Sequence, residues 1–162
     1  MNKKVLTITH AAVIAALYVV LTLVANAFGL ASNVIQVRFS EALTILPYFT
    51  PAAIPGLFVG CLLSNMMTGA ALPDILFGSL ATLIGAVFTR KLRKNKWMAP
   101  LPPIVANAIL IPPVLLFAYG IKPYWFSLIT VTIGEIISCG VLGMILLFAL
   151  QMHAGRIFPT QN

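Results

Sequence analysis

EALTILPYFTPAAIPGLFVGCLLSNMM, residues 41–67, is an apolar stretch that three prolines interrupt, and the topology of the chain depends on it. Pro47, Pro51 and Pro55 are compatible with a single kinked membrane span, because prolines are tolerated in membrane helices. The alternative is a pair of short helices, Glu41–Phe49 and Ile54–Met67, with a turn at residues 50–53 between them. The two arrangements put all later segments on opposite sides of the membrane.

The distribution of basic residues favours two helices. Five of the ten Lys and Arg residues lie between Arg90 and Lys96, and Lys3 and Lys4 open the chain. Excess Lys and Arg in short loops marks the cytoplasmic side of a membrane protein. A single span would leave the 90–96 loop outside, whereas two helices return it to the side of the N-terminus. Each helix is short for a hydrocarbon core of about 30 Å, so neither is expected to cross it fully.

The composition indicates a membrane protein. Hydrophobic residues make up 60% of the chain and charged residues 8%, whereas roughly a quarter of the residues in soluble domains are charged. The net charge of +7 comes from clusters at segment ends, so it indicates orientation and not a nucleic-acid partner. The first apolar run, Val5–Phe28, is long enough to span and is longer than the core of a cleaved signal peptide. The other expected spans are Asp74–Thr89, Trp97–Ala118 and Trp125–Leu150.

These segments predict an all-α membrane protein, a six-helix transmembrane bundle that forms a single domain over residues 1–162. Both termini are expected in the cytoplasm, which makes the chain a multi-pass protein of the cell membrane. Residues 29–40 are the first extracellular loop. Helices two and three are the short, proline-broken pair.

The chain has three acidic residues, Glu41, Asp74 and Glu135. Glu135 lies about ten residues into the last helix, which is roughly 15 Å along its axis. A carboxyl at that depth is costly and usually faces a cavity or a partner. Asn107 lies at a similar depth on the preceding, antiparallel helix, so the two side chains are expected to converge on a ligand. An interhelical hydrogen bond is the alternative for Asn107.

The charged residues Arg38, Glu41 and Asp74 have competing interpretations. Arg38 and Glu41 are three residues apart, so they can pair on one helical face as a surface ion pair or contact a ligand together. Asp74 is expected to be an N-cap or a first-turn acid, with ligand binding as the alternative. The aromatic residues at the outer end, Tyr119, Tyr124 and Trp125, are typical of an interfacial belt.

Small residues on the first helix predict close helix packing. Ala11, Ala12, Ala15 and Ala16 form two overlapping Ala-x-x-x-Ala spacings, and Gly56 and Gly60 form a GxxxG motif in the third helix. The sequence contains no nucleophile beside a base, no metal-ligand cluster, no HExxH motif and no phosphate-binding glycine loop. We therefore expect neither an enzyme nor a bound metal or cofactor, and no ATP-hydrolysing site in this chain.

Several blocks of the sequence resemble the queuosine-precursor transporter (QueT) family. They are VRFSEAL at 37–43, LPYFTPAAIPGLFVGC at 46–61, LPD at 72–74, FGSLATL at 77–83, APLPPIVANA at 99–108 and IGE at 133–135. The resemblance implies the substrate-binding S component of an energy-coupling factor (ECF) importer. Such a component assembles with a transmembrane coupling protein and two cytoplasmic ATPases, which hydrolyse the ATP. Its Ala-x-x-x-Ala strip contacts the coupling protein, which corresponds here to Ala11, Ala12, Ala15 and Ala16.

The implied substrate is a 7-deazaguanine precursor of queuosine. A guanine-like edge offers adjacent N–H donors that Glu135 or Glu41 can accept, while Asn107 meets the ring oxygen. An aminomethyl cation favours the second carboxylate. The aromatic residues that can stack on the ring are Phe39, Tyr119 and Trp125.

The implied transport cycle has three steps. Residues 29–40 close over the ligand, the first helix docks on the coupling protein, and ATP-driven reorientation delivers the ligand inside. The alternatives are an S component for another vitamin or heterocycle, and a stand-alone secondary transporter that uses Glu135 as a proton site.

Overall fold

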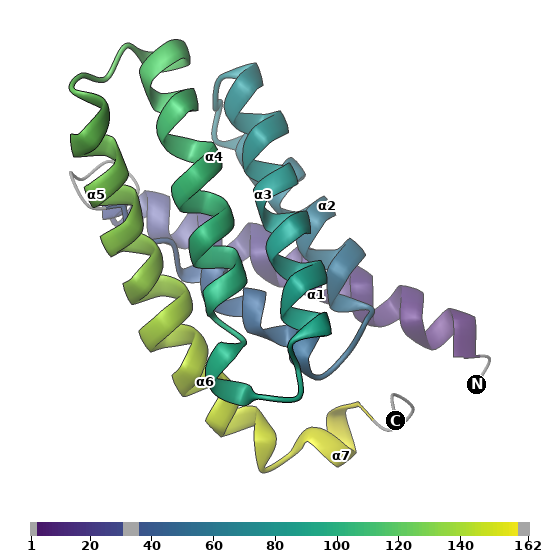
Figure 1. The fold of residues 1–162 in the computed structure, drawn as a ribbon. Helices are drawn as coiled ribbons and strands as arrows, with labels where there is room; N and C mark the ends of the chain where they lie inside the picture. Colours follow the sequence, from purple (N-terminus) through teal and green to yellow (C-terminus); the bar gives the residue numbers. More distant parts are fainter. Residues whose placement is uncertain (1–2, 31–35, 159–162) are drawn as a thin grey trace.

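The computed structural model describes residues 3–30 and 36–158, and within them all regular secondary structure is helical. The α-helices are α1 (Lys3–Ala27), α2 (Ala53–Met67), α3 (Leu72–Lys91), α4 (Leu101–Tyr119), α5 (Tyr124–Glu135), α6 (Gly143–Gln151) and α7 (Ala154–Ile157). The 3-10 helices are η2 (Phe39–Tyr48) and η3 (Lys96–Met98), and η4 (Ile136–Leu142) is a π-helix. Figure 1 shows α3, α4 and the rod of α5 and α6 side by side, with α1 crossing behind them.

The expected number of six helices is wrong, because the described residues form seven α-helices. The predicted last span is one continuous helical rod, Tyr124–Gln151, but its centre is π-helical, which divides it into α5 and α6. A short α7 follows the rod. The predicted helix over residues 41–49 is present as the 3-10 helix η2.

Four helices are long and apolar enough to cross a membrane. They are Lys3–Ala27, Leu72–Lys91, Lys96–Tyr119 and Tyr124–Gln151. These four segments include all of the long spans expected from the sequence. The chain is therefore a multi-pass membrane protein.

The two-helix interpretation of residues 41–67 is confirmed, since η2 and α2 are separate and meet at residues 49–52. Pro55 falls in the first turn of α2, where its missing N–H leaves no hydrogen bond unmade. The ten residues of η2 rise roughly 20 Å at about 2.0 Å each, and the 15 residues of α2 rise roughly 22 Å at about 1.5 Å each. Both lengths fall below a hydrocarbon core of about 30 Å, as expected.

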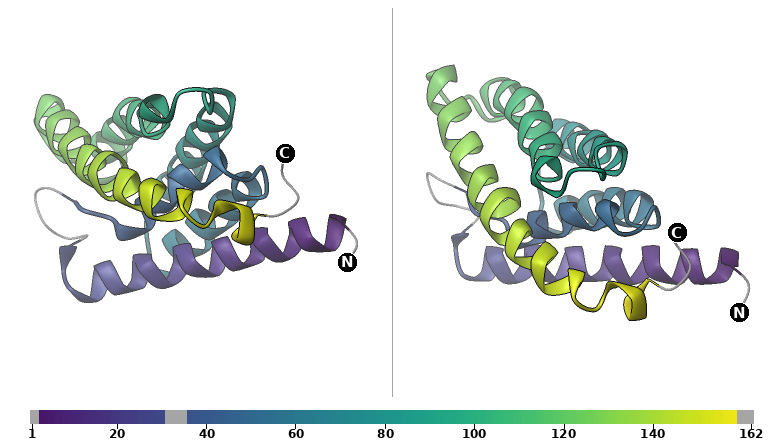
Figure 2. Two further views of the ribbon diagram at one scale, coloured as in Figure 1. Left: turned by 90° about the horizontal axis from the view of Figure 1, so that it is seen from below. Right: turned by 60° about the horizontal axis from the view of Figure 1, so that its bottom comes forward.

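The centre of the bundle is occupied by η2, which contacts α1, α2, α3, α6 and η4. Seven of its ten residues are buried. Leu43 and Leu46 of η2 pack with Ile14 and Tyr18 of α1 and with Leu57 of α2. Figure 2 shows α1 along one side of the bundle, with the C-terminal end of the chain running across it.

The first two α-helices approach each other closely through small residues. A Cβ atom on Gly60 would lie 2.7 Å from the Tyr18 Cβ and 3.0 Å from the Ala15 carbonyl oxygen. A Cβ atom on Gly56 would lie 2.7 Å from the Ala11 carbonyl oxygen. The GxxxG motif therefore packs within the bundle, as expected, against the strip that contains Ala11 and Ala15. Residues Ala12 and Ala16 are exposed on the other side of α1.

The basic loop at residues 90–96 and the C-terminal segment lie at the same end of the bundle (Figure 1). Arg90 donates hydrogen bonds of 3.3 Å from Nη1 to the carbonyl oxygens of Pro47 and Tyr48 at the end of η2. Phe158 stacks on Phe49 with 5.7 Å between ring centroids and meets His10 of α1 at 5.9 Å. This end is the predicted cytoplasmic end, and that assignment stays a prediction from the bias of basic residues.

The close packing of α1 and α2 predicts the effect of adding one methyl group. Gly60→Ala should destabilise the bundle by about 1–3 kcal/mol, because the Tyr18 side chain and the α1 backbone must move apart. Thermal unfolding in detergent measures the change. The matched control is Gly140→Ala in η4, where the nearest atom would be at 3.8 Å and no loss is expected. Equal stability of the two variants would contradict the close contact.

Candidate ligand-binding site

A polar cavity of about 290 Å³ lies at the end of the bundle opposite the basic loop. It is bordered by the end of α1, the loop between α2 and α3, and the end of α4. The polar side chains that line it are Thr22, Asn26, Gln36, Arg38, Asn65, Thr68, Asp74 and Tyr119. Because α3 runs from this cavity to the basic loop, the cavity occupies the predicted extracellular end.

Asp74 lines this cavity and has one carboxylate oxygen without a hydrogen-bond partner. The side chain is 6% exposed, and its Oδ2 accepts a hydrogen bond of 3.2 Å from the Tyr119 hydroxyl. That hydroxyl accepts a 2.9 Å bond from the backbone N–H of Ala71. Oδ1 of Asp74 is buried without a hydrogen-bond partner. Asp74 is a first-turn acid, as expected, but the N-cap alternative is wrong, since Ala71 holds the cap position of α3 and no side chain caps it.

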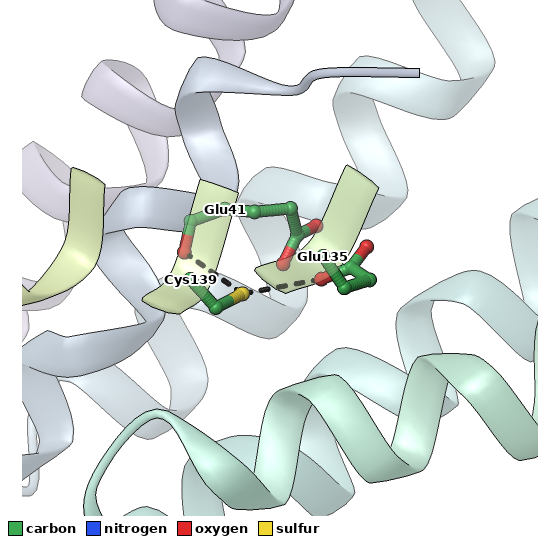
Figure 3. Close-up of side chains that lie close together, drawn as sticks. All are labelled: Glu41, Glu135 and Cys139. Atoms are coloured by element: carbon green, nitrogen blue, oxygen red, sulfur yellow. Dashed lines mark hydrogen bonds between the residues drawn. The ribbon is translucent and has the colours of Figure 1, made fainter. Parts of the chain in front are cut away.

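Beneath the cavity, Glu41 of η2 and Glu135 of α5 turn their carboxyl groups toward each other (Figure 3). A ligand atom from each of them and the Cys139 sulfur all lie within 4.8 Å of one another. The Tyr18 hydroxyl donates a hydrogen bond to Oε1 of Glu41, and the Cys139 thiol lies 3.1 Å from Oε2 of Glu135. Glu41 is 2% exposed, and its Oε2 has no hydrogen-bond partner.

Glu41, Glu135 and Cys139 are also the kind of side chains that bind a transition metal. In the structure, however, Tyr18 and Cys139 direct their protons at the two carboxylates, so two of the acceptor oxygens are already used. The carboxyl groups of Glu41 and Glu135 thus lie close together, and each accepts one hydrogen bond from a neighbouring side chain.

Asn107 lies next to this pair. Its side chain is 4% exposed and close enough to Glu135 to interact with that carboxyl, yet Nδ2 makes no hydrogen bond. The structure thus brings together the two polar residues that the sequence placed at equal depth. The Nδ2 donor of Asn107 and the Oε2 acceptor of Glu41 are both left without a hydrogen bond. Their role in ligand binding stays a prediction.

Arg38 connects the cavity with the carboxyl pair. Its guanidinium interacts electrostatically with all three acidic side chains of the chain, Asp74, Glu41 and Glu135. None of these is a direct ion pair in the part of the chain that the structure describes. The surface ion pair of Arg38 and Glu41 is therefore not formed, and Glu41 is not on the surface.

The position of Arg38 is set by its backbone. Its N–H donates a 3.1 Å hydrogen bond to the Ser138 hydroxyl of η4, and the preceding extended residues run against α5 at Gly134. A Cβ atom on Gly134 would collide with the Gln36 carbonyl oxygen. The small residue before Glu135 therefore allows the η2 segment to reach the last span.

The three aromatic residues that were predicted to stack on the ligand differ in their position relative to the cavity. Tyr119 lines the cavity. Phe39, the first residue of η2, is half-buried and does not line it, and Trp125 is 61% exposed on α5. In this conformation Tyr119, and not Trp125, is therefore in a position to stack on a ring ligand.

The prediction from sequence committed to no role for Asn65 and did not include three other residues of the site. Asn65 lines the cavity, and Tyr18, Thr22 and Cys139 bind or border the acidic groups. Tyr18 and Thr22 share the buried stripe of α1 with Ile14 and Ala25. Polar side chains at helical spacing on that otherwise apolar stripe were the signal for them.

Comparison with known proteins agrees with this architecture. Residues 8–152 match the family model described as QueT transporter. The chain is 33% identical over 83 residues to the queuosine precursor transporter QueT of Lactococcus lactis subsp. cremoris (strain MG1363). That alignment covers 51% of this chain and 48% of the relative, so the match spans about half of the relative's length. No solved structure matches the chain. Since the family model covers most of the chain, the protein belongs to the QueT transporter family.

Proposed function

We propose that the chain is the membrane-embedded substrate-capture subunit, or S component, of an ATP-driven ECF importer, and that it binds a 7-deazaguanine precursor of queuosine from outside the cell. Membership of the QueT transporter family and the name of the relative support the substrate class. The observation that carries the proposal is the polar cavity with unsatisfied buried groups at and beneath it. These are Oδ1 of Asp74, Oε2 of Glu41 and Nδ2 of Asn107.

The cavity has the size and chemistry for a small polar ring. Its volume of about 290 Å³ is near the lower end of small-molecule sites, which span roughly 300–1,000 Å³. A guanine-like edge presents two adjacent N–H donors and a ring oxygen acceptor. The unsatisfied groups of the site comprise two carboxylate acceptors and one amide donor, which is the complementary set.

We assign the two N–H donors of the ring to Asp74, because this residue lines the cavity and one of its carboxylate oxygens has no hydrogen-bond partner. Arg38 and Asn65 are the neighbouring donors for the ring oxygen. The carboxyl pair of Glu41 and Glu135 then accepts a group on the inner side of the ring. An aminomethyl cation suits this pair, because two carboxylates in an apolar surrounding lack a direct counter-ion.

Import against a gradient requires an energy source outside this chain, since the sequence has no phosphate-binding loop. In the proposed cycle, residues 29–40 close the outer side, although residues 31–35 lie outside those described. Helix α1 then docks on a transmembrane coupling protein through Ala12 and Ala16, which are exposed, and two cytoplasmic ATPases drive reorientation. Ala11 and Ala15 are already in contact with α2 and are not free to dock.

A second function has support from one observation. Glu41 and Glu135 each have a carboxylate oxygen within 4.8 Å of the other, and buried carboxyl groups are common proton carriers in transporters. The site is also compatible with an S component for another heterocycle that carries adjacent N–H donors.

Removing one carboxylate tests the binding assignment. Asp74→Asn should weaken binding of 7-aminomethyl-7-deazaguanine about 10- to 100-fold, because the amide is uncharged and has an NH2 donor in place of one acceptor oxygen, and a hydrogen bond to a charged group contributes about 1.5–3 kcal/mol. Isothermal titration with purified protein measures the affinity. Thr130→Val, an isosteric change on α5 outside the cavity, should leave it unchanged.

Glu135→Gln tests the inner carboxyl pair with two ligands. It should weaken binding of the aminomethyl compound about 10-fold or more and affect the neutral 7-cyano compound less, because only the former brings a cation. Wild-type protein that binds neither compound contradicts the substrate, while equal losses for both ligands contradict the cation assignment only.

Leucine substitutions on α1 test the docking surface. Ala12→Leu with Ala16→Leu should abolish uptake in cells that contain the coupling protein, yet leave ligand binding unchanged, since both side chains point away from the bundle. Ala118→Leu, at another exposed alanine, is the control. Loss of binding together with uptake would count against a docking role.

The energy source is tested by uptake of labelled ligand. Transport should stop when the coupling ATPases are deleted and should persist when the proton gradient is dissipated. The reverse result would favour the proton-coupled transporter.

A further inference from the structure

A second polar cavity, of about 480 Å³, lies at the basic end of the bundle. Arg93 and Lys94 border it on one side, and Gln151, Ala154 and Gly155 of the α6–α7 segment border it on the other. Its remaining lining residues, Tyr48, Phe49 and Phe158, are aromatic. Phe49 and Phe158 are stacked, and Tyr48 packs edge-on against Phe49. The cavity is thus a cationic cleft with an aromatic wall.

The chain has no acidic side chain to neutralise this cleft. Its three acidic residues all surround Arg38 at the other end of η2, and Glu41 is roughly 14 Å from Tyr48 at about 2.0 Å per residue. In contrast, residues 90–96 contain five basic side chains. Arg93 also lies near enough to Arg90 for the two cations to repel each other. None of the acidic side chains therefore supplies a negative charge to the cleft.

The other basic residues of the loop already have partners. Arg90 binds the carbonyl oxygens at the end of η2, Lys91 lies over the Phe88 ring at 5.0 Å, and Lys96 lies over the Phe148 ring at 4.9 Å. Arg93 and Lys94 are exposed and make no hydrogen bond within the described residues. These two side chains, which line the cleft, are the ones available to a ligand.

The position of the cleft matches the surface of a bilayer. Three of the apolar spans begin or end beside it, at Lys91, Lys96 and Gln151. Exposed apolar side chains flank these span ends, with Trp97 64% exposed and Met152 82% exposed. Basic residues next to exposed aromatic and apolar side chains are typical of the headgroup region on the cytoplasmic side.

We propose that this cleft binds the phosphate headgroup of an anionic membrane lipid, such as phosphatidylglycerol, with Arg93 and Lys94 as the phosphate ligands. The acyl chains lie against the exposed apolar surface near Trp97 and Met152. An anionic lipid fits better than free phosphate, because the ends of three apolar spans lie beside the cleft. It also fits better than an acidic protein segment, because an apolar surface of this kind is already covered by acyl chains in the membrane. This proposal does not depend on the proposed transport function.

Because of the position of the cleft, we also expect the bound lipid to stabilise the C-terminal segment. Its walls come from the basic loop, from the turn after η2 and from α6–α7, so a bound headgroup bridges these segments in addition to the stacking of Phe158 on Phe49 and the packing of α6 on η2. A ligand that binds only the folded state raises its stability in proportion to its affinity.

The test is binding of phosphatidylglycerol to the purified chain in neutral detergent, by native mass spectrometry, with phosphatidylcholine of the same acyl chains as reference. Arg93→Gln and Lys94→Gln should each reduce the preference for phosphatidylglycerol about fivefold, the equivalent of about 1 kcal/mol per basic residue near an anionic surface. Lys91→Gln removes a charge from the same loop outside the cleft, and Lys122→Gln removes one at the opposite end. Both controls should retain the wild-type preference.

Three results would overturn the proposal. Equal binding of the two lipids would exclude headgroup recognition. An equal loss in Lys91→Gln would assign the preference to the loop charge as a whole and not to the cleft. Competition by inorganic phosphate at millimolar concentration would identify a site for the free anion. All four variants keep the apolar packing of the bundle, so a loss in thermal stability without lipid is not expected from any of them.

Discussion

The burial of η2 at the centre of the bundle is the constraint on which the rest of the structure depends. A 3-10 helix of ten residues is unusually long, and within a membrane its polar groups must all be satisfied by protein. Neighbouring segments supply the partners: Tyr18 for Glu41, Thr22 for Ser40, Cys139 for Thr44 and Arg90 for the terminal carbonyl groups. The surrounding helices are thus arranged around a segment that is too short to span by itself.

The same segment joins the two charged regions of the protein. At its start, Arg38 and Glu41 belong to the acidic site, and at its end, Pro47 and Tyr48 bind Arg90 of the basic loop. The three acidic side chains and the basic loop therefore lie at opposite ends of one element. Any displacement of η2 on ligand capture would be transmitted to the basic end, where α7 rests on Phe49 through Phe158.

Hydropathy and the bias of basic residues were sufficient to predict the spans and to divide residues 41–67 into two helices. Neither signal reports helix type, so the 3-10 form of η2 and the π-form of η4 were not predicted, and the number of helices was wrong. The depth of each residue along its helix correctly predicted that Asn107 lies near Glu135. Positions on two neighbouring antiparallel helices can be compared by counting residues from the end that they share. Asp74 was harder, since a first-turn acid is usually explained by the helix dipole, and only the fold shows that it lines a cavity and has an unpartnered carboxylate oxygen.

The contacts of η2 with the last span have a consequence for biogenesis. Glu41 and the Cys139 thiol that lies near its backbone are 98 residues apart, and Arg38 and its partner Ser138 are 100 apart. During synthesis the central segment must therefore wait for its partners Ser138 and Cys139 until nearly the entire chain has emerged from the ribosome. A nascent chain halted before residue 135 lacks half of the carboxyl pair, so we expect it to remain at the translocon or in contact with a chaperone rather than settle in lipid.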